Sequence, residues 1–562
     1  MIGILLLFLS GCQSAQLSDV QEMKPTEIPT ATPRPAPTVD PELSWEDKLA
    51  FYKKAEERED LSVVFSAESG FYSKDISLEL TSEGAAEIFY TDDGSEPWPS
   101  STRYTQPIVL TATDAELPRC AVIRAAAYYS DGTKSPVFTR TFFLNNKIGK
   151  RFSLPVFSIV APPEELTSGP MALLVGKRAQ DTSEKAKRDV LLQVFLKNGD
   201  LVMDQAATLR VYGDSSRDMP VKSLRLIAGT DAQAEPQSFA YSFFGTSNAQ
   251  GEALDHYTQL VLSSSEADFQ YAFIRDELAQ SLAKLARLQD YEDVQPVVVY
   301  INGEYYGLEW LHEVYSNEFF QAIYGASEGR YAVIDWNAGK AEPLDQADQD
   351  AAAAFQETYE QFLKEDLYEK ETLDRLQRFM DVENYLDYCA LNIIIDNPEW
   401  PSHMLAYAYI PADGDAQSAQ WRFLPHDMDH AFGLKGGKEA AEQDTLEEAL
   451  HPDSALYAPL FAALMEREEY RTYFAEKVRA LLEDKLSKDS MLAALKELHD
   501  ARNGEMQHYF SRIDALKKVR NSGIWMKKKD FSTAYSALTD YIKARPAAVQ
   551  KMMDEHLPLE TP

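Results

Sequence analysis

The pattern of apolar residues changes twice along this chain of 562 residues, and this change limits the fold more than any single motif. Residues 62–145 hold short β-type runs separated by turns, residues 151–315 mix such runs with one amphipathic helix, and helical runs dominate from residue 350 onward. Single hydrophobic cores stop growing near roughly 250–300 residues, so more than one domain is expected. We predict a small Ig-like β-sandwich at 62–145, followed by an α+β domain at 151–562. That domain is expected to have two lobes, a β-rich one at 151–315 and a helical one at 316–562.

The first residues form an apolar stretch that ends in a cysteine. The sequence MIGILLLFLSGC is too short to span a bilayer and resembles the bacterial lipoprotein signal, in which Cys12 receives the lipid. Residues 13–61 are rich in proline and threonine at first and then polar, which predicts a stiff tether and a short helix capped by Ser44. These features predict a protein outside the cytoplasm, anchored to the bacterial membrane by a lipid on Cys12.

The β-type runs of residues 62–145 carry turn signals. Asp93-Gly94 and Asp131-Gly132 are pairs that favour tight hairpin turns, and their spacing is typical of a β-sandwich. The run FSAESGFYSKDISLELT resembles the small Ig-like module at the C-termini of chitobiases and β-hexosaminidases. The resemblance implies an accessory spacer or a carbohydrate-proximal module, and no catalysis.

The charge of the chain limits its partners. It holds 55 Lys and Arg against 90 Asp and Glu, a formal net charge of −35. Such a surface repels phosphate backbones, so no nucleic-acid partner is expected. Three cysteines without a CxxC pair provide neither a disulfide framework nor a zinc cluster.

Residues 423–433, FLPHDMDHAFG, place two aspartates one residue apart in apolar surroundings. Burying a carboxylate costs several kcal/mol unless a partner or a metal compensates. On a strand, Asp427 and Asp429 would share one face, and His426 and His430 would lie on the other. Paired carboxylates suit Mg²⁺ or Mn²⁺ carrying phosphates, whereas a helix would bring the two histidines together and suit zinc. The aromatic neighbours and the final glycine favour the strand.

A second polar cluster lies in residues 209–226, LRVYGDSSRDMPVKSLRL. A Gly/Ser turn between β runs can hold phosphate oxygens through its backbone N–H groups, although neither a Walker A motif nor a kinase glycine loop is present. A plain surface turn is the alternative. The cations of this cluster are Arg210, Arg217, Lys222 and Arg225.

Both clusters match one family. Residues from about 152 to 556 resemble the CotH kinases, a family named for a spore-coat protein, with an atypical protein-kinase fold. The segments that carry the resemblance include LPVFSIV, RVYGDSSRDMPVKSLRL, FIRDELAQSLA, VVVYINGEYYGLEWLHE, DNPEW, WRFLPHDMDHAFG and ARPAAVQKMM. It implies a bilobal domain that uses ATP with Mg²⁺ or Mn²⁺ to phosphorylate Ser or Thr of surface proteins.

The resemblance also implies roles for individual residues. Asp427 and Asp429 match the Asp-x-Asp that holds the metal ion at the ATP phosphates. The residues expected to bind the nucleotide phosphates are Ser215, Ser216, Arg217 and Lys222.

The expected catalytic segment departs from the family pattern. The family shows Asn-x-Asp-Trp-Pro followed by asparagines, whereas this chain has Glu399 at the aspartate position and His403 and Met404 at the asparagines. The extra methylene of a glutamate moves its carboxylate by about 1 Å, which can cost ~10²-fold in rate. We therefore take Glu399 as the candidate base and Asp396 as a substitute.

Three functions compete. The first is a lipid-anchored kinase of surface proteins. The second is a catalytically impaired nucleotide-binding or surface-assembly protein of the same fold, which the changes at 399, 403 and 404 favour. The third is a glycosyltransferase that uses a DxD motif, Mn²⁺ and a nucleotide sugar, but no doubly wound β-α-β run precedes the motif.

Overall fold

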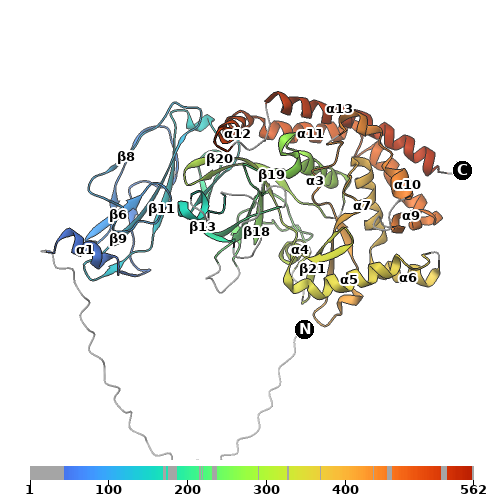
Figure 1. The fold of residues 1–562 in the computed structure, drawn as a ribbon, viewed down its shortest axis with the longest axis horizontal. Helices are drawn as coiled ribbons and strands as arrows, with labels where there is room; N and C mark the ends of the chain where they lie inside the picture. Colours follow the sequence, from blue (N-terminus) through green and yellow to red (C-terminus); the bar gives the residue numbers. More distant parts are fainter. Residues whose placement is uncertain are drawn as a thin grey trace, which may run out of the picture.

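The computed structural model describes residues 43–168, 172–174, 186–213, 217, 219–230, 237–288, 290–325, 328–367, 369–434, 436–451, 459–520 and 528–559. Cys12, Ser215 and Ser216 lie outside these residues. Figure 1 shows a β-rich module at one end, a group of strands in the middle and a helical part at the other end. The chain is therefore multidomain, with a β-rich module followed by a domain of strands and helices.

The β-rich module begins with helix α1 (Trp45–Tyr52), and the side chain of Ser44 caps it by accepting from the Asp47 backbone N–H. The cap predicted from the sequence is confirmed. The main sheet is built around the apolar strand β9 (Arg119–Tyr128), which pairs with β6 (Glu87–Thr91), β10 (Thr133–Lys134) and β11 (Phe138–Leu144). The outer strands of this sheet are β7 (Thr102–Arg103) on β6, β1 (Glu56–Glu57) on β10 and β3 (Gly70–Tyr72) on β11. Two separate strand pairs are β2 (Val64–Phe65) with β5 (Leu80–Thr81) and β4 (Ile76–Leu78) with β8 (Ile108–Leu110).

The module shares a hydrophobic core with the following domain. The ring of Phe71 on β3 lies 5.1 Å from Phe152 and 6.0 Å from Phe195, and Phe143 on β11 lies 5.0 Å from Tyr300. Aromatic rings at these separations pack favourably beyond their buried area. The module therefore has its own core and also packs against its neighbour, and its accessory role stays a prediction.

A closed barrel forms the first part of the second domain. The pairs Asn198-Gly199 and Asn302-Gly303 predict hairpin turns, and both hairpins are confirmed. A parallel pairing of β12 with β19 closes the ring. In order around the barrel the strands are β12 (Val156–Val160), β13 (Arg188–Phe195), β14 (Leu201–Val211), β15 (Leu224–Ala228), β18 (Gln259–Ser263), β20 (Glu304–His312) and β19 (Val294–Ile301). The predicted amphipathic helix is α3 (Arg275–Ala286). Short elements beside the barrel are η1 (Ile148–Lys150), α2 (Pro163–Leu166), β16 (Phe239–Ala240), β17 (His256–Tyr257) and η4 (Glu266–Gln270).

A second sheet follows the barrel and α4 (Asn317–Tyr324). It contains β22 (Lys340–Pro343), β21 (Arg330–Asn337), β23 (His403–Ile410) and β24 (Arg422–Leu424), in that order. The apolar runs LAYAYI and WRFL predict the last two strands, and the structure confirms both. The pattern of apolar residues over 374–395 predicts a single helix, which is wrong, because the chain forms α6 (Lys370–Phe379) and α7 (Val382–Ile395). Asp381 causes the break by accepting from the Asn384 N–H and capping the second helix.

Of the remaining helices, α5 packs against the second sheet, whereas α11, α12 and α13 run along the top of the domain, with α11 against α3 and α12 against β20 (Figure 1). On α13, the buried Arg545 donates to the carbonyls of Ile393 and Ile394 and ties this helix to the end of α7. These helices and the short elements between them are η5 (Gln346–Asp348), α5 (Gln349–Phe362), η6 (Ala416–Ser418), η7 (Gly437–Glu442), α8 (Thr445–Leu450), α9 (Pro459–Met465), α10 (Glu468–Glu483), α11 (Lys488–Asn503), α12 (Met506–Arg520) and α13 (Lys528–His556). Within the described residues, none of the helices combines the length and the apolarity that crossing a bilayer requires.

Candidate active site

The segment with the two aspartates is a loop. Strand β24 ends at Leu424, and Asp427 has a left-handed backbone with φ of 52°. The backbone N–H of Met428 donates to Asp276 Oδ1 at 2.9 Å, and Asp429 Oδ2 accepts from the Ala267 N–H at 2.6 Å. The predicted strand is therefore wrong, because distant side chains and turns take up hydrogen bonds that a strand partner would have used.

The predicted separation of the histidines from the aspartates fails with the strand. Asp427, Asp429 and His426 line the same cavity, of about 470 Å³, between the barrel and the second sheet. His430 instead lies between Glu399 and Asp429, with Nε2 3.9 Å from a carboxylate oxygen of each. Both histidines are therefore part of the site region.

Two arginines of the predicted cation cluster line this cavity. Arg210 on β14 and Arg225 on β15 are direct partners across the two strands. Arg217 and Lys222 are not among the described residues that line it. Lys222 is buried, its amine donates to the carbonyls of Arg217 and Met219, and its role in nucleotide binding stays a prediction. The register of the barrel therefore places the arginine pair, and not Lys222, among the residues that line this cavity.

Buried acidic and imidazole groups form the floor of the cavity. His312 Nδ1 lies 3.2 Å from Glu292 Oε2, and its Nε2 lies 3.3 Å from Glu277 Oε1. Burial opposes the charged form of His312, but the hydrogen bonds that its ring donates to the two glutamates outweigh burial and raise its pKa to about 10. Burial likewise opposes the charge of His426, but the nearby Glu292 carboxylate, 3.7 Å away, outweighs burial and raises the pKa of His426 to about 9. Both imidazoles are therefore cationic at neutral pH and offset part of the acidic charge.

Two carboxyl groups beside the loop are held away from their ionised form. Burial raises the pKa of Asp276 to about 7, although the charge of His312 acts in the opposite direction. Burial and then the charge of Asp427 raise the pKa of Asp429 well above its usual value. A cation placed between Asp427 and Asp429 would offset both the burial of Asp429 and its repulsion by the charge of Asp427. The donor set of the cavity therefore fits a divalent ion.

The predicted catalytic segment reaches the same cavity from the end of α7. Asn397 is buried and its Oδ1 accepts from the Glu399 N–H at 3.2 Å, and the Glu399 carbonyl accepts from the His403 N–H at 2.9 Å. His403 begins β23 and lines the cavity, whereas Met404 is buried in the core. Glu399, His403 and Asp427 offer ligand atoms that all lie within 4.8 Å of one another. One cavity thus brings together the cation cluster, the loop with the two aspartates and the predicted catalytic segment.

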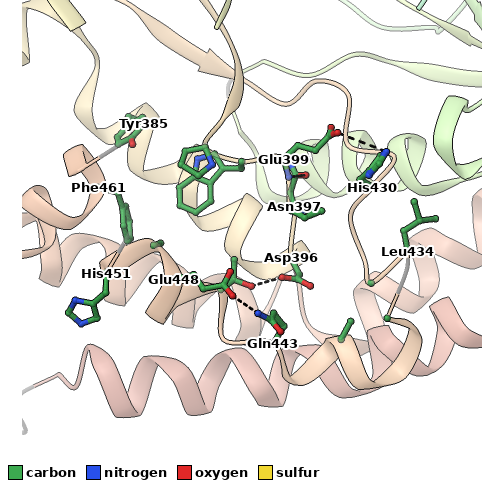
Figure 2. Close-up of a pocket in the computed structure, with 18 residues that line it drawn as sticks. Tyr385, Asp396, Asn397, Glu399, His430, Leu434, Gln443, Glu448, His451 and Phe461 are labelled. Carbon is green, nitrogen blue, oxygen red and sulfur yellow. Dashed lines mark hydrogen bonds and ion pairs between the residues drawn. The ribbon is translucent and has the colours of Figure 1, made fainter. Parts of the chain in front are cut away.

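Asp396 lies apart from this group. It ends α7 with a left-handed backbone, and its Oδ1 accepts from Thr445 Oγ1 at 2.6 Å. Figure 2 shows Glu399 turned toward His430 in a second cavity, of about 770 Å³, and Asp396 on the opposite side of that cavity. Glu399 therefore has the better position for chemistry at the first cavity, and Asp396 serves to join α7 to α8.

Several residues of the site were not predicted from the sequence. Asp276, Glu292, His312 and Asp335 all line the first cavity. One signal was present, since His312 lies in the apolar run YYGLEWLHEVY, where an ionisable group needs a buried partner. The partners themselves come from other strands and helices and are not visible in any local pattern.

Two family models match the chain. The model described as CotH kinase protein matches residues 209–549, which is more than half of the chain, and the model described as Fn3 associated matches residues 78–142. The chain therefore belongs to the CotH kinase protein family, which confirms the family predicted from the sequence and the β-rich module before it. Family membership indicates ATP-dependent phosphotransfer. No curated protein matches the chain.

Proposed function

We propose that the protein is an ATP-dependent protein kinase that phosphorylates Ser or Thr of surface proteins. The observation that carries the proposal is the make-up of one cavity, with Arg210 and Arg225 on one wall and Asp427 and Asp429 on another. Triphosphate needs cations on its oxygens, and carboxylates hold the ion that shields it. The barrel and the helical part would then be the two lobes of a kinase-like domain with the nucleotide between them.

A divalent ion, Mg²⁺ or Mn²⁺, would be held by Asp427 and Asp429. When bound, such an ion neutralises charge that develops on the phosphate oxygens. Arg210 and Arg225 would align the phosphates from the barrel, where strand pairing fixes their positions. His312 and His426, cationic in the floor, would keep the acidic wall from repelling the nucleotide.

Glu399 would accept the proton of the attacking hydroxyl. Its carboxylate lies at the border of the two cavities, 3.9 Å from His430, so an acceptor side chain can reach it from the second cavity while the nucleotide fills the first. A proton acceptor must lie within hydrogen-bond reach of the hydroxyl that attacks. This arrangement assigns the larger, half-apolar cavity to the protein substrate.

One observation favours the second candidate, a nucleotide-binding or surface-assembly protein without efficient transfer. Glu399 occupies a position where the sequence pattern of the family has aspartate, and its longer side chain displaces the carboxylate. The buried Asn397 fixes the backbone of this turn, so the displacement is not absorbed by the main chain. Nucleotide binding would persist and transfer would be slow.

Incubation of the full chain with γ-labelled ATP and Mg²⁺ or Mn²⁺ tests the proposal. We expect label on the protein itself, and loss of label by at least about 100-fold in Glu399→Gln, because the glutamine cannot take the proton. Glu497→Gln, at an exposed acidic residue of α11 that lines neither cavity, is the matched control. ATP binding without any label in the wild-type protein would instead support the assembly protein.

We also propose an extracytoplasmic location, with the membrane reached through lipidated Cys12 and the substrate on the cell surface. The support is the apolar stretch ending in Leu9-Ser10-Gly11-Cys12 and the proline-rich segment after it. Cys12→Ala should move the protein from the membrane fraction to the soluble fraction, because a lipid is the anchor. A Cys12→Ala protein that stays with the membrane argues against lipidation, and Cys120→Ala is the control.

A further inference from the structure

His403 and Asp427 present ligand atoms at a distance that one ion can bridge. His403 Nδ1 lies 3.9 Å from Asp427 Oδ2, and the carboxylate of Glu399, the proposed proton acceptor, offers an oxygen within 4.8 Å of these ligand atoms. Two ligands that each lie about 2.1 Å from an ion are about 3 Å apart at right angles and about 4 Å apart on opposite sides. The observed spacing therefore requires only small side-chain movements to close on an ion.

A separate contact orients the imidazole. His403 Nε2 lies 3.0 Å from Asp335 Oδ1 on β21, the strand that pairs with β23. Imidazoles that bind metals nearly always present their other ring nitrogen to a carboxylate or carbonyl, which fixes the ring and increases its basicity. With Nε2 held by Asp335, the remaining Nδ1 faces Asp427. This arrangement is independent of the acidic cluster and points to a metal ligand.

Hydrogen bonds of the backbone fix the turn with Glu399 and His403 and the loop with Asp427. The His403 N–H donates to the Glu399 carbonyl at 2.9 Å, and Ser402 Oγ donates to the same carbonyl at 2.7 Å. The Asp427 loop is fixed by the bond from the Met428 N–H to Asp276. Ligands on fixed turns lose little freedom when an ion binds.

We propose that the His403 imidazole joins Asp427 as a ligand of the ion of this site, and that this ion is Mn²⁺ in preference to Mg²⁺. The inference rests on the proposed function for the phosphates that complete the coordination. Mg²⁺ prefers oxygen ligands in strict octahedral geometry, whereas first-row transition ions accept imidazole nitrogen. His403 thus determines which metal the protein uses, a property that the paired aspartates alone do not give.

The inference is tested by titrating the full chain with Mn²⁺ in the absence of nucleotide. Binding is measured as the loss of the electron paramagnetic resonance signal of free Mn²⁺. Competition with Mg²⁺ gives the second affinity. We expect the wild-type protein to bind Mn²⁺ more tightly than Mg²⁺, and His403→Asn to weaken Mn²⁺ by about 10-fold while changing Mg²⁺ by less than about 3-fold. Asp335→Asn should weaken Mn²⁺ by about 10-fold through the lost orientation of the ring.

His451→Asn is the matched control, since that imidazole lines the second cavity and its side chain is 73% exposed. Thermal unfolding without metal shows that each variant folds. Equal Mn²⁺ affinity in His403→Asn and wild type, or tighter binding of Mg²⁺ than of Mn²⁺ by the wild type, overturns the inference. If Asp427→Asn still abolishes binding in that case, the proposed function stands without it; if Asp427→Asn also has no effect, both fail.

Discussion

Asparagine in place of Asp427 or Asp429 should abolish metal-dependent binding of ATP, with a loss of at least about 100-fold in affinity. Each replacement removes one of two anionic ligands from a cavity wall where Asp429 is nearly buried and water cannot substitute fully. Calorimetric titration of ATP with Mn²⁺ present and absent measures the effect. Asp413→Asn, on an exposed turn, is the control.

The same variants should keep or gain thermal stability without metal. Burial and the neighbouring Asp427 disfavour the ionised form of Asp429, so a neutral side chain removes a cost, and the asparagine oxygen still accepts from the Ala267 N–H. A lower melting temperature together with unchanged ATP binding would show that the aspartates are structural.

Glu309→Met should raise the free energy of unfolding by about 1–3 kcal/mol at pH 8. Glu309 on β20 is fully buried, and neither of its carboxylate oxygens has a hydrogen-bond partner among the described residues. Burial raises its pKa well above the usual 4.5. The Glu309 carboxyl group therefore lacks the compensation that His312, on the same strand, provides to Glu277 and Glu292.

The effect of Glu309→Met should depend on pH. The folded state holds the proton of Glu309 more tightly than the unfolded state, so wild-type stability falls as pH rises above about 4.5 and through the raised pKa of the folded protein. The advantage of the methionine should accordingly be small at pH 5 and grow toward pH 8. Urea unfolding at both values measures it, with exposed Glu304→Met on the same strand as control. An equal advantage at both values would mean that packing, not the carboxyl group, limits stability.

The sequence identified part of the site because some residue types are costly where they stand. Asp427 and Asp429 could be predicted, since paired carboxylates inside an apolar run need a ligand or a partner. Their conformation could not, because the loop is fixed by the bonds with Asp276 and Ala267, which lie 152 and 162 residues away in the chain. Local alternation therefore gave a strand where tertiary hydrogen bonds produce a turn.

The cation cluster shows the same limit in the barrel. Arg210 and Arg225 stood out in an acidic chain, but the choice between them and Lys222 depends on the pairing of β14 with β15 and on the carbonyls that hold the lysine amine. The hairpins at 198–199 and 302–303 could be predicted, because Asn-Gly pairs determine tight turns by themselves. The closure of the barrel joins strands from both ends of its sequence, so no local pattern contains it.

A crystal structure of the full chain with Mn²⁺ and a non-hydrolysable ATP analogue would show where the nucleotide and the ion bind, with anomalous diffraction locating the ion. We expect the triphosphate in the cavity with its oxygens toward Arg210 and Arg225, and the Mn²⁺ peak beside Asp427, Asp429 and His403. A nucleotide seated in the second cavity between Trp400 and Phe461, or an ion held away from Asp427, would contradict this expectation.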